Sequence, residues 1–325
     1  MMEMTRTKLT AIFAALVAML VLFPAVPASA GHAPNLPYGG VNTHLTYNNT
    51  VYNDYELVAQ KLKQSETKLY RDAINPGQPQ AYYDRFATAV RRIRTVSGAR
   101  LDSIFVRADQ TPAQITQILD QLAPLIAEGH VVAVEGSNEW DNVAGSTDPD
   151  WAVDIRAHQC ELHKQVKARF PNLTVIGPSL SYKTTGSYVG DLSHCMDVGN
   201  FHYYSANGIY APDLVARWQD KGIVAGWADG AGDPMITTES NGVYSCDGAY
   251  PGTSEQTQAD RMKELYQALG GLEYGGSHRV FVYELLNGSR PSRDACHREN
   301  NFGIFRTDGS TKPVFFPVLE ANRRG

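Results

Sequence analysis

The chain repeats one pattern: a short run of mostly apolar residues, then a longer segment whose apolar positions recur at helical spacing. Runs of the first kind cover 38–45, 68–72, 103–107, 131–139, 174–178, 198–204, 235–240 and 279–287. Helical patterns lie at 54–65, 79–96 and 111–128, the last opening with Thr111 as N-cap and Pro112 in the first turn. Apolar runs that alternate with amphipathic helices are typical of a parallel sheet. The pattern predicts eight βα units.

Eight βα units with strands buried on both faces fit a closed barrel. The alternative is an open, doubly wound sheet, which usually marks its first βα turn with a glycine-rich phosphate loop. Gly39-Gly40 does not supply that G-x-G-x-x-G pattern. No low-complexity segment or Pro/Ser-rich linker divides residues 31–325, a length that suits one barrel of about 250 residues with loop insertions. We predict an α/β fold: a single (β/α)8 TIM-barrel domain.

Residues 1–30 have the features of a secretory signal peptide. Arg6 and Lys8 precede an apolar stretch at 9–23, and the sequence A-S-A at 28–30 is a small-residue cleavage site. An uncleaved membrane anchor is the alternative, but the stretch is shorter than the roughly 18–20 apolar residues that cross a bilayer. We expect an extracellular mature chain that begins at Gly31 and has no membrane contact after cleavage.

Charge and cysteine content restrict the partners. The formal net charge is −5 and no basic stripe is present, so nucleic acid is not an expected partner. We expect a monomer without a cofactor. The cysteines are Cys160, Cys195, Cys246 and Cys296. An even number in an exported chain indicates disulfides, and their places relative to the predicted strands favour the pairs 160–195 and 246–296. A zinc site would need close pairs such as C-x-x-C, so we expect no metal.

Two of the apolar runs deliver a glutamate near their carboxyl ends. One ends in Asn138-Glu139, and the other contains Thr238-Glu239. In an α/β barrel the carboxyl ends of the strands meet on the catalytic face. Two carboxylates facing one cleft can cleave a glycosidic bond, since one protonates the leaving oxygen and the other attacks or activates water. Either glutamate alone could be a surface or structural carboxylate; the pair predicts a glycosidase.

The two carboxylates need different protonation states. A general acid at Glu139 requires a raised pKa, which Trp140 and the second carboxylate could provide as an apolar wall and a like charge. Asn138 could hydrogen-bond a sugar hydroxyl. A nucleophile at Glu239 must stay ionised, which an arginine such as Arg71, at the end of the second run, would favour.

Other polar residues also fall at strand ends. His202 and Tyr204 end the sixth run, and a tyrosine near the second glutamate would help to orient it. His44, in the first run, could bind a sugar hydroxyl or cap the barrel. Residues at strand ends converge on one cleft, whereas unrelated surface residues need not.

These motifs resemble clan A glycoside hydrolases, the (β/α)8 group with its acid/base on strand four and its nucleophile on strand seven. Residues 135–139 (EGSNE) resemble the clan's strand-four motif, residues 238–239 its strand-seven motif, and His202 with a following tyrosine its strand-six pair. Residues 302–313 are similar to the segment after strand eight in family 39-like and family 5-like members. The resemblance spans nearly the whole mature chain. It implies that Glu139 is the acid/base and Glu239 the nucleophile, supported by Arg71, Asn138 and His202.

The chain departs from the clan at two positions. Many members end strand eight with a tryptophan that floors the sugar site, whereas this chain has Tyr283 there. Tyr283, Trp227 or Trp140 could take that place. Trp140 also replaces the proline that commonly follows the acid/base. Both departures bear on the substrate and leave the two carboxylates in place.

Two further glutamates need an interpretation. Glu135 has period-two spacing with Glu139 and faces the barrel interior. It could be a third catalytic acid, but we expect a buried structural glutamate that pairs with an arginine such as Arg107. Glu284 could anchor a loop or contact substrate. The expected function is a secreted, metal-independent, retaining glycosidase that acts within a polysaccharide. The alternatives are a non-catalytic carbohydrate-binding barrel and a metal-dependent polysaccharide deacetylase, although the histidines are scattered along the chain.

Overall fold

The computed structural model describes residues 39–145, 147–181, 186–204, 235–241, 243–246, 254–270, 279–290, 293–294 and 296–324. The predicted signal peptide and Trp227 lie outside the described residues, so their assignments stay predictions. Among the described residues, no helix is long and apolar enough to cross a membrane.

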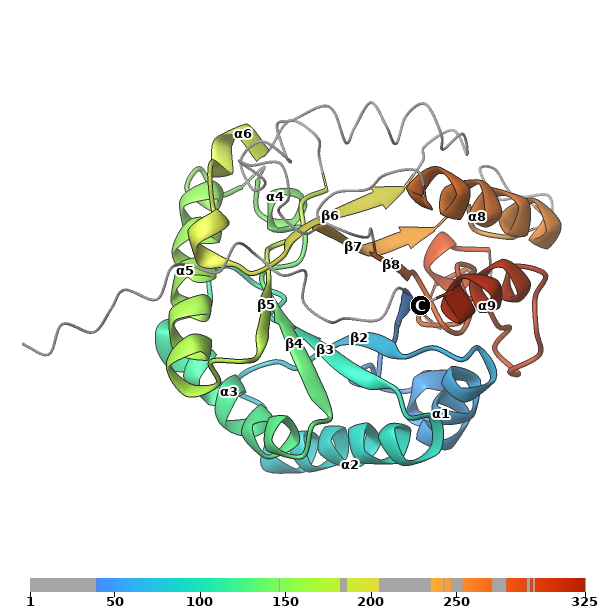
Figure 1. The fold of residues 1–325 in the computed structure, drawn as a ribbon, viewed down its shortest axis with the longest axis horizontal. Helices are drawn as coiled ribbons and strands as arrows, with labels where there is room; N and C mark the ends of the chain where they lie inside the picture. Colours follow the sequence, from blue (N-terminus) through green and yellow to red (C-terminus); the bar gives the residue numbers. More distant parts are fainter. Residues whose placement is uncertain are drawn as a thin grey trace, which may run out of the picture. The chain divides into compact units, whose positions relative to one another are not determined.

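Eight parallel strands form a nearly closed ring (Figure 1). Their bounds are β1 Gly39–Asn42, β2 Leu69–Ala73, β3 Arg100–Ile104, β4 Val131–Glu135, β5 Thr174–Ile176, β6 Gly199–Tyr204, β7 Met235–Asn241 and β8 Arg279–Val282. Strands β5 to β1 pair in sequence, β1 pairs with β8, and β8 continues through β7 to β6. One isolated parallel bridge, Ile176 to Val198, joins the β5 and β6 sides. This topology confirms the predicted TIM barrel.

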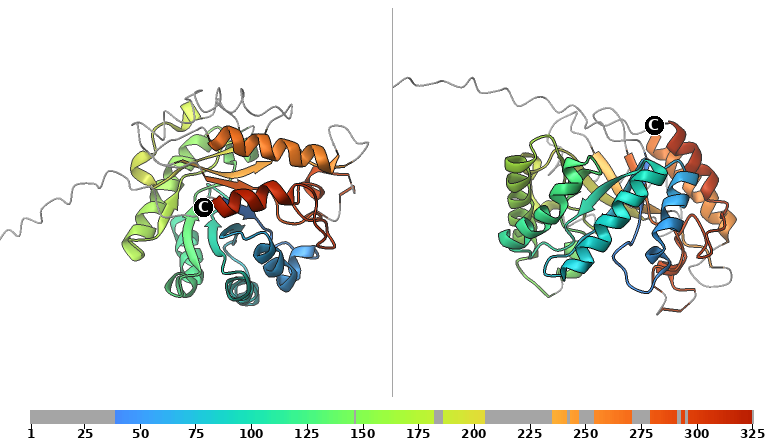
Figure 2. Two further views of the ribbon diagram at one scale, coloured as in Figure 1. Left: turned by 45° about the vertical axis from the view of Figure 1, so that its right-hand side comes forward. Right: turned by 90° about the horizontal axis from the view of Figure 1, so that it is seen from below.

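Helices surround the ring of strands, as Figures 1 and 2 show from several sides. They are α1 Tyr55–Gln64, α2 Gln80–Ser97, α3 Pro112–Ala127, α4 Trp140–Val143, α5 Trp151–Arg169, α6 Gly186–Val189, α8 Glu255–Gly270 and α9 Phe315–Arg324, with short 3-10 turns η1 Val51–Asn53, η2 Ser193–Cys195 and η3 Arg298–Asn300. The Thr111 side chain caps α3 by accepting from the backbone N–H of Gln114, and Pro112 occupies the first turn. The three predicted helices therefore agree with the structure to within one residue at each end.

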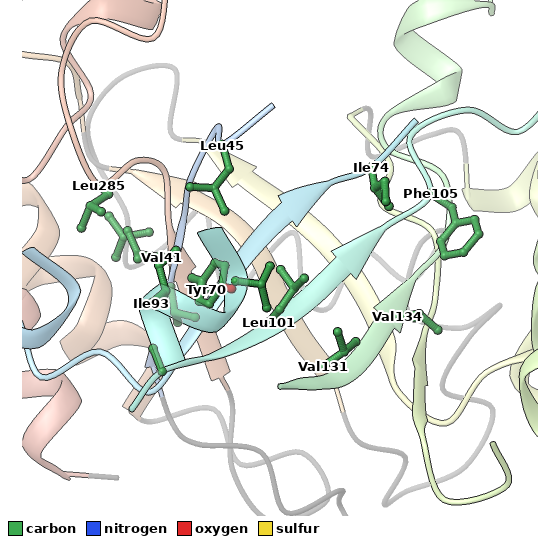
Figure 3. Close-up of a cluster of buried hydrophobic side chains, with 14 of the residues drawn as sticks. Val41, Leu45, Tyr70, Ile74, Ile93, Leu101, Phe105, Val131, Val134 and Leu285 are labelled. Atoms are coloured by element: carbon green, nitrogen blue, oxygen red, sulfur yellow. The ribbon is translucent and has the colours of Figure 1, made fainter. Parts of the chain in front are cut away.

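Strand residues alternate between two apolar regions. Val41, Tyr70 and Leu101 belong to the cluster that packs the outer face of the barrel against helices such as α2, with Ile93 (Figure 3). The neighbouring inward positions form a separate, smaller cluster: Leu69, Ala133, Ile176, Val198, Ile236 and Phe281. This period-two division explains why the strands read as continuous apolar runs in the sequence.

A second group of inward-facing residues is polar and completely or almost completely buried: Asn42, Arg71, Asp102, Glu135, Asn200 and Thr238. Burial of polar and charged groups is unfavourable unless they find partners. Side-chain hydrogen bonds join five of these residues in one network: Asn42, Arg71, Glu135, Asn200 and Thr238. The inward position of Asp102 also explains why the sequence placed the third strand too late. The strand begins at Arg100, but polar residues at 100 and 102 interrupt its apolar pattern.

Both predicted disulfides are confirmed. Cys160 on α5 bonds Cys195 in η2, with a Cα–Cα distance of 4.7 Å. Cys246, which follows β7, bonds Cys296, which follows β8, with a Cα–Cα distance of 5.5 Å. The second bond joins two loops at the carboxyl end of the barrel, beside the site described next.

Candidate active site

Glu139 sits at an unusual turn between β4 and α4. Its backbone adopts the left-handed conformation, with φ 47° and ψ 41°. Such a conformation costs a non-glycine residue about 1 kcal/mol and persists only where the surroundings hold it. Here the Glu139 N–H donates to the Ser179 carbonyl at 3.0 Å, and the Asn138 N–H donates to the Val106 carbonyl at 3.1 Å. The turn aims the Glu139 side chain towards the barrel axis.

An irregularity in β7 aims Glu239. The pairing register of β7 shifts against both neighbouring strands. Against β6 the shift falls between Phe201 and His202 of β6, and against β8 it falls between Thr237 and Ser240 of β7. Strict alternation would send consecutive residues to opposite faces, whereas such a bulge re-aims a side chain. As a result, both Thr238 and Glu239 contact inward-facing groups: Thr238 contacts Glu135, and Glu239 contacts Arg71.

Arg71 connects the two halves of the site. Its Nε and Nη2 donate to the two carboxylate oxygens of Glu135 at 2.8 and 2.6 Å. Nη1 donates to Asn42 Oδ1 at 2.9 Å and to Glu239 Oε1 at 2.5 Å, and Nη2 also donates to Asn138 Oδ1 at 2.7 Å. All five N–H donors of the guanidinium are therefore used. The predicted contact between Arg71 and Glu239 is present.

Glu135 pairs with a different arginine from the one expected. The prediction named Arg107, but Arg107 lies on the surface and pairs with Asp109. Glu135 is fully buried and receives the fork of Arg71 from β2. Arg71 lies within the barrel interior at the level of Glu135, whereas Arg107 follows the end of β3, so only the former can satisfy an interior carboxylate.

Glu239 is held from three sides and remains 13% exposed. Besides Arg71, the Tyr204 hydroxyl donates to Glu239 Oε2 at 3.0 Å, and His202 Nδ1 lies 3.6 Å from the same oxygen. A buried cation at hydrogen-bond distance favours an ionised carboxylate. The arrangement leaves an oriented and accessible carboxylate beside a fixed cation, as a nucleophile requires.

Glu139 is paired with His202. Their atoms Oε1 and Nδ1 lie 2.7 Å apart, and Glu139 is 21% exposed. Burial acts to raise the pKa of Glu139, but the hydrogen bond and charge of His202, with smaller effects of Ser181 and Arg71, lower it to about 2. Burial acts to lower the pKa of His202, but Glu239 and Glu139 raise it above its usual value. The expected raised pKa of Glu139 was wrong, because the proton of the pair is held on the histidine side.

Trp140 does not form the apolar wall that this expectation assigned to it. Its ring belongs to the hydrophobic core and is 4% exposed, and the Arg107 guanidinium carbon lies 5.0 Å from the ring centre. In this position Trp140 supports the turn after Glu139 from below and presents no open surface for a sugar.

The two catalytic candidates face each other. One oxygen of Glu139, one of Glu239 and a ring nitrogen of His202 all lie within 4.8 Å of one another. Such a group could in principle hold a cation. Here, however, Arg71 already places a positive charge 2.5 Å from Glu239, which would repel a metal ion. The other geometric candidate within the described residues, Cys160 with His194 and Cys195, contains a disulfide.

Asn138 is oriented for a ligand. Its Oδ1 accepts from Arg71 Nη2 and, at 3.4 Å, from the Ser179 hydroxyl. These contacts fix the amide, so that its nitrogen is free to donate; among the described residues this nitrogen has no protein acceptor. The predicted role of Asn138, a hydrogen bond to a sugar hydroxyl, fits this orientation.

Aromatic and acidic residues that follow β1 and β8 border the site. His44 Nε2 lies 2.8 Å from Glu284 Oε2, and its ring stacks on Tyr47 with 4.4 Å between ring centres. Tyr52 and Ser289 also donate to Glu284, which is fully buried. Glu284 was expected to anchor a loop or to contact substrate, and these contacts fit the loop anchor. His44 links this anchor to the aromatic edge of the site.

Tyr283 occupies the position where clan A members often have tryptophan. It is 7% exposed, donates its hydroxyl to Glu299 at 2.8 Å, and packs against Tyr204 and Phe302. Burial acts to raise the pKa of Tyr283, so it remains a neutral phenol. Tyr283 thereby holds Tyr204 in place, and Tyr204 in turn contacts Glu239.

No role was predicted for three residues of this network: Asn42, Asn200 and Thr238. Asn42 Nδ2 donates to the Thr238 carbonyl at 2.9 Å, and Asn200 Nδ2 donates to Glu135 Oε1 at 3.0 Å. A signal was available for Asn200, because it lies two residues before His202 and so faces the same side of β6.

Comparison with known proteins extends the fold assignment. No family model and no curated protein matches the sequence. Among solved structures, GH5_18 from Streptomyces cattleya in complex with GlcNAc aligns with a TM-score of 0.69 and 13% identity, over 89% of this chain and 80% of that one. A GH2 β-galacturonidase from Eisenbergiella tayi aligns with a TM-score of 0.62 and 15% identity, over 89% of this chain.

A third similar structure is an active-site mutant of the Rhizomucor miehei β-1,3-glucanosyltransferase, with a TM-score of 0.59 and 15% identity over 85% of this chain and 96% of that one. The chain spans about half the length of the β-galacturonidase, 52% of it. At these identities the likeness concerns the fold. The chain thus has a (β/α)8 barrel, the fold of these solved structures, with a paired-carboxylate site at the carboxyl end of its strands.

Proposed function

We propose that this protein is a secreted glycoside hydrolase that cleaves a polysaccharide with retention of anomeric configuration. The observation that carries the proposal is the arrangement around the two glutamates. Glu239 is held by a buried arginine and a tyrosine, and Glu139 by a histidine, with carboxylate oxygens within 4.8 Å. The arrangement sets a carboxylate beside a fixed cation, opposite a second carboxyl group that can share a proton with a histidine.

In the first step Glu239 attacks the anomeric carbon, and a bond forms between its oxygen and that carbon while the glycosidic bond breaks. Glu139 donates a proton to the departing oxygen. In the second step Glu139 takes a proton from water, which displaces Glu239 and releases the sugar. Arg71 and Tyr204 stabilise the negative charge that returns to the Glu239 carboxylate when its bond to the sugar breaks.

The separation of the carboxylates supports retention. Retaining glycosidases keep their two carboxyl groups about 5–5.5 Å apart, whereas inverting enzymes need about 6.5–9.5 Å to admit a water molecule. One oxygen of Glu139 and one of Glu239 lie within 4.8 Å of each other. A water molecule between the sugar and a base would not fit this spacing.

Sugars are bound by similar proteins, since GH5_18 from Streptomyces cattleya was solved with GlcNAc and with Manb1-4GlcNAc. Two disulfides and the predicted signal peptide at 1–30 support an extracellular location. A secreted enzyme meets polymers, so we propose endo-action by a monomer on a polysaccharide or an oligosaccharide derived from it.

The test is a screen of the mature protein on β-glucans, xylans, mannans, galactans and arabinans, with reducing ends measured. The matched controls are Glu239→Gln and Glu139→Gln, and a parallel arm contains a chelator. Hydrolysis that both substitutions abolish and the chelator leaves intact supports the proposal, and NMR of the first anomer released decides retention. Binding without hydrolysis would favour a carbohydrate-binding barrel, and loss of activity to the chelator would favour a metal-dependent hydrolase.

A further inference from the structure

Thr238 is a fully buried residue that the mechanism above does not use, although it touches the groups that flank both glutamates. Its Oγ1 lies 2.9 Å from Asn200 Oδ1, 3.1 Å from Glu135 Oε1 and 3.2 Å from His202 Nε2. A threonine hydroxyl carries one proton and two acceptor lone pairs. The three contacts therefore cannot all be donations by Thr238.

The amide orientation of Asn200 fixes one of these contacts. Its Nδ2 donates to Glu135 Oε1 at 3.0 Å and to the Gly177 carbonyl at 3.2 Å, and both of these partners accept hydrogen bonds. The backbone N–H of Thr238 donates to Oδ1 of the same amide at 3.3 Å. A flipped amide would lose all three hydrogen bonds, so the atom that faces the Thr238 hydroxyl is an oxygen.

The hydroxyl proton of Thr238 is consequently committed away from His202. Its two oxygen neighbours, Asn200 Oδ1 and the Glu135 carboxylate that Arg71 holds with two hydrogen bonds, can only accept. One of them receives the proton. The contact at 3.2 Å between Thr238 and His202 must then be a donation by the histidine Nε2–H to the threonine oxygen.

This assignment has a consequence on the other side of the imidazole ring. When His202 is neutral, its single proton is on Nε2, and the lone pair of Nδ1 points at Glu139 Oε1, 2.7 Å away. Two lone pairs at that distance repel unless a proton lies between them. We propose that Thr238 is a positioning residue that fixes the Nε2–H tautomer of His202 and thereby makes His202 and Glu139 retain one shared proton for general acid catalysis.

The charges around His202 agree with this role. Glu139 and Glu239 face the ring from the ends of β4 and β7, and Arg71 approaches from β2. Burial disfavours the imidazolium, but the two carboxylates outweigh it and raise the pKa of His202. The hydrogen bond and charge of His202 lower the pKa of Glu139 against the effect of burial, so the two groups titrate as a pair that holds one proton. Thr238 supplies the geometric reason why the histidine cannot release it by changing tautomer.

The catalytic meaning of this inference rests on the proposed function, but the tautomer does not, so the deciding experiment needs no substrate. Long-range ¹H–¹⁵N NMR of the imidazole nitrogens is recorded across a pH titration, with His202 identified by its loss in a His202→Gln variant. Above the titration of the pair we expect Nε2 protonated and Nδ1 unprotonated in the natural protein. A neutral His202 with its proton on Nδ1 would overturn the proposal without any variant.

A matched pair of variants tests the cause. Thr238→Ser keeps the hydroxyl and should keep the tautomer. Thr238→Val keeps the shape and removes the acceptor, so His202 should move to the Nδ1–H tautomer and donate to the Glu139 carboxylate. The pair should then lose its shared proton at a pH lower by about one unit, the equivalent of one hydrogen bond. An unchanged titration in Thr238→Val, with circular dichroism and melting temperature like those of Thr238→Ser, would show that Thr238 does not set the tautomer.

The two proposals can fail separately. Hydrolysis with a tautomer insensitive to Thr238 would refute the positioning role and leave the glycosidase intact. The expected tautomer in a protein that hydrolyses nothing in the polysaccharide screen would refute the glycosidase and leave the hydrogen-bond assignment. If Thr238→Val does not fold, the tautomer of the natural protein and of Thr238→Ser still decides the assignment.

Discussion

Arg71 Nη1 donates to Glu239 Oε1 at 2.5 Å while the rest of the same guanidinium is engaged by Glu135, Asn42 and Asn138. A nucleophile is thus attached to a cation that cannot swing away, because every other donor of that cation is already bound. Binding of this kind limits the geometry of Glu239 more strongly than a single ion pair could.

Replacing Arg71 should therefore damage both stability and activity. Arg71→Met leaves Glu135 buried and unpaired, and breaking a buried ion pair in this way costs about 3–5 kcal/mol. The matched control is Arg107→Met, because Arg107 pairs with Asp109 at the surface, where such a pair contributes about 0–1 kcal/mol. Urea unfolding measures both changes. A larger loss in Arg107→Met than in Arg71→Met would contradict the assignment of Arg71 as the partner of Glu135.

The contrast between these arginines also shows where the sequence was sufficient. Strand periodicity placed Glu139 and Glu239 near the carboxyl ends of their strands and Glu135 in the interior, and all three lie there. Arg71, expected at the end of its strand, lies in the middle of β2. Periodicity did not reveal which arginine contacts Glu135, because that depends on the relative level of β2 and β4 along the barrel axis. This level follows from the packing of the whole ring rather than from spacing within one strand.

Thr238 and Glu239 illustrate a second limit. Strict alternation along β7 would let only one of two consecutive residues face inward, yet both do. The shift in pairing register that allows this arises between strands, and no residue in the run marks it. Similarly, the sequence did not show that Glu139 contacts His202 from a distant strand. The pKa of Glu139 was therefore expected to be raised, whereas this contact lowers it.

Removal of Glu139 should slow hydrolysis most for substrates with a poor leaving group. A general acid contributes typically about 10²–10⁴-fold, and most for a poor leaving group. Glu139→Ala should therefore hydrolyse polysaccharide about 10²-fold more slowly or worse, while an aryl glycoside of the matching sugar with an acidic phenol should still form the intermediate. Azide should then restore turnover, since it attacks without a general base. Product analysis should find a glycosyl azide of retained configuration from Glu139→Ala; a retained azide from Glu239→Ala and an inverted one from Glu139→Ala would exchange the two roles.

Lys312 should make stability depend on pH near neutrality. It is fully buried, donates to the Asn301 carbonyl at 3.1 Å and to Asn287 Oδ1 at 3.3 Å, and burial lowers its pKa to about 7. In the unfolded chain its pKa is about 10.4. Between these values the unfolded state binds more protons, so stability rises with pH, by at most about 1.4 kcal/mol per unit.

The comparison for Lys312 is the natural protein against Lys312→Met in urea at pH 7, 8 and 9. The difference in unfolding free energy between the two should move in favour of the natural protein as the pH rises. Use of a difference cancels the titration of other groups. A difference that stays flat over this range would mean that Lys312 keeps its charge in the folded protein.

The two disulfides should differ in their effect on the site. Cys246–Cys296 joins the loops after β7 and β8, and Cys246 packs against the cluster of Tyr244, Tyr283 and Phe302, which also includes Tyr204. Because Tyr204 donates to Glu239, loosening this cluster should lower kcat by several-fold as well as reduce stability.

Cys160–Cys195 supplies the matched control for that disulfide, because it joins α5 to η2 away from both glutamates. Its loop of 35 residues and the loop of 50 residues of the other disulfide imply similar stabilisation, about 2–5 kcal/mol each. The double variants Cys246→Ser/Cys296→Ser and Cys160→Ser/Cys195→Ser should therefore lose comparable stability, yet only the first should lose kcat when both are assayed well below their melting temperatures. Equal losses of kcat would mean that the aromatic cluster keeps Tyr204 in place without the covalent bond, and that activity follows global stability alone.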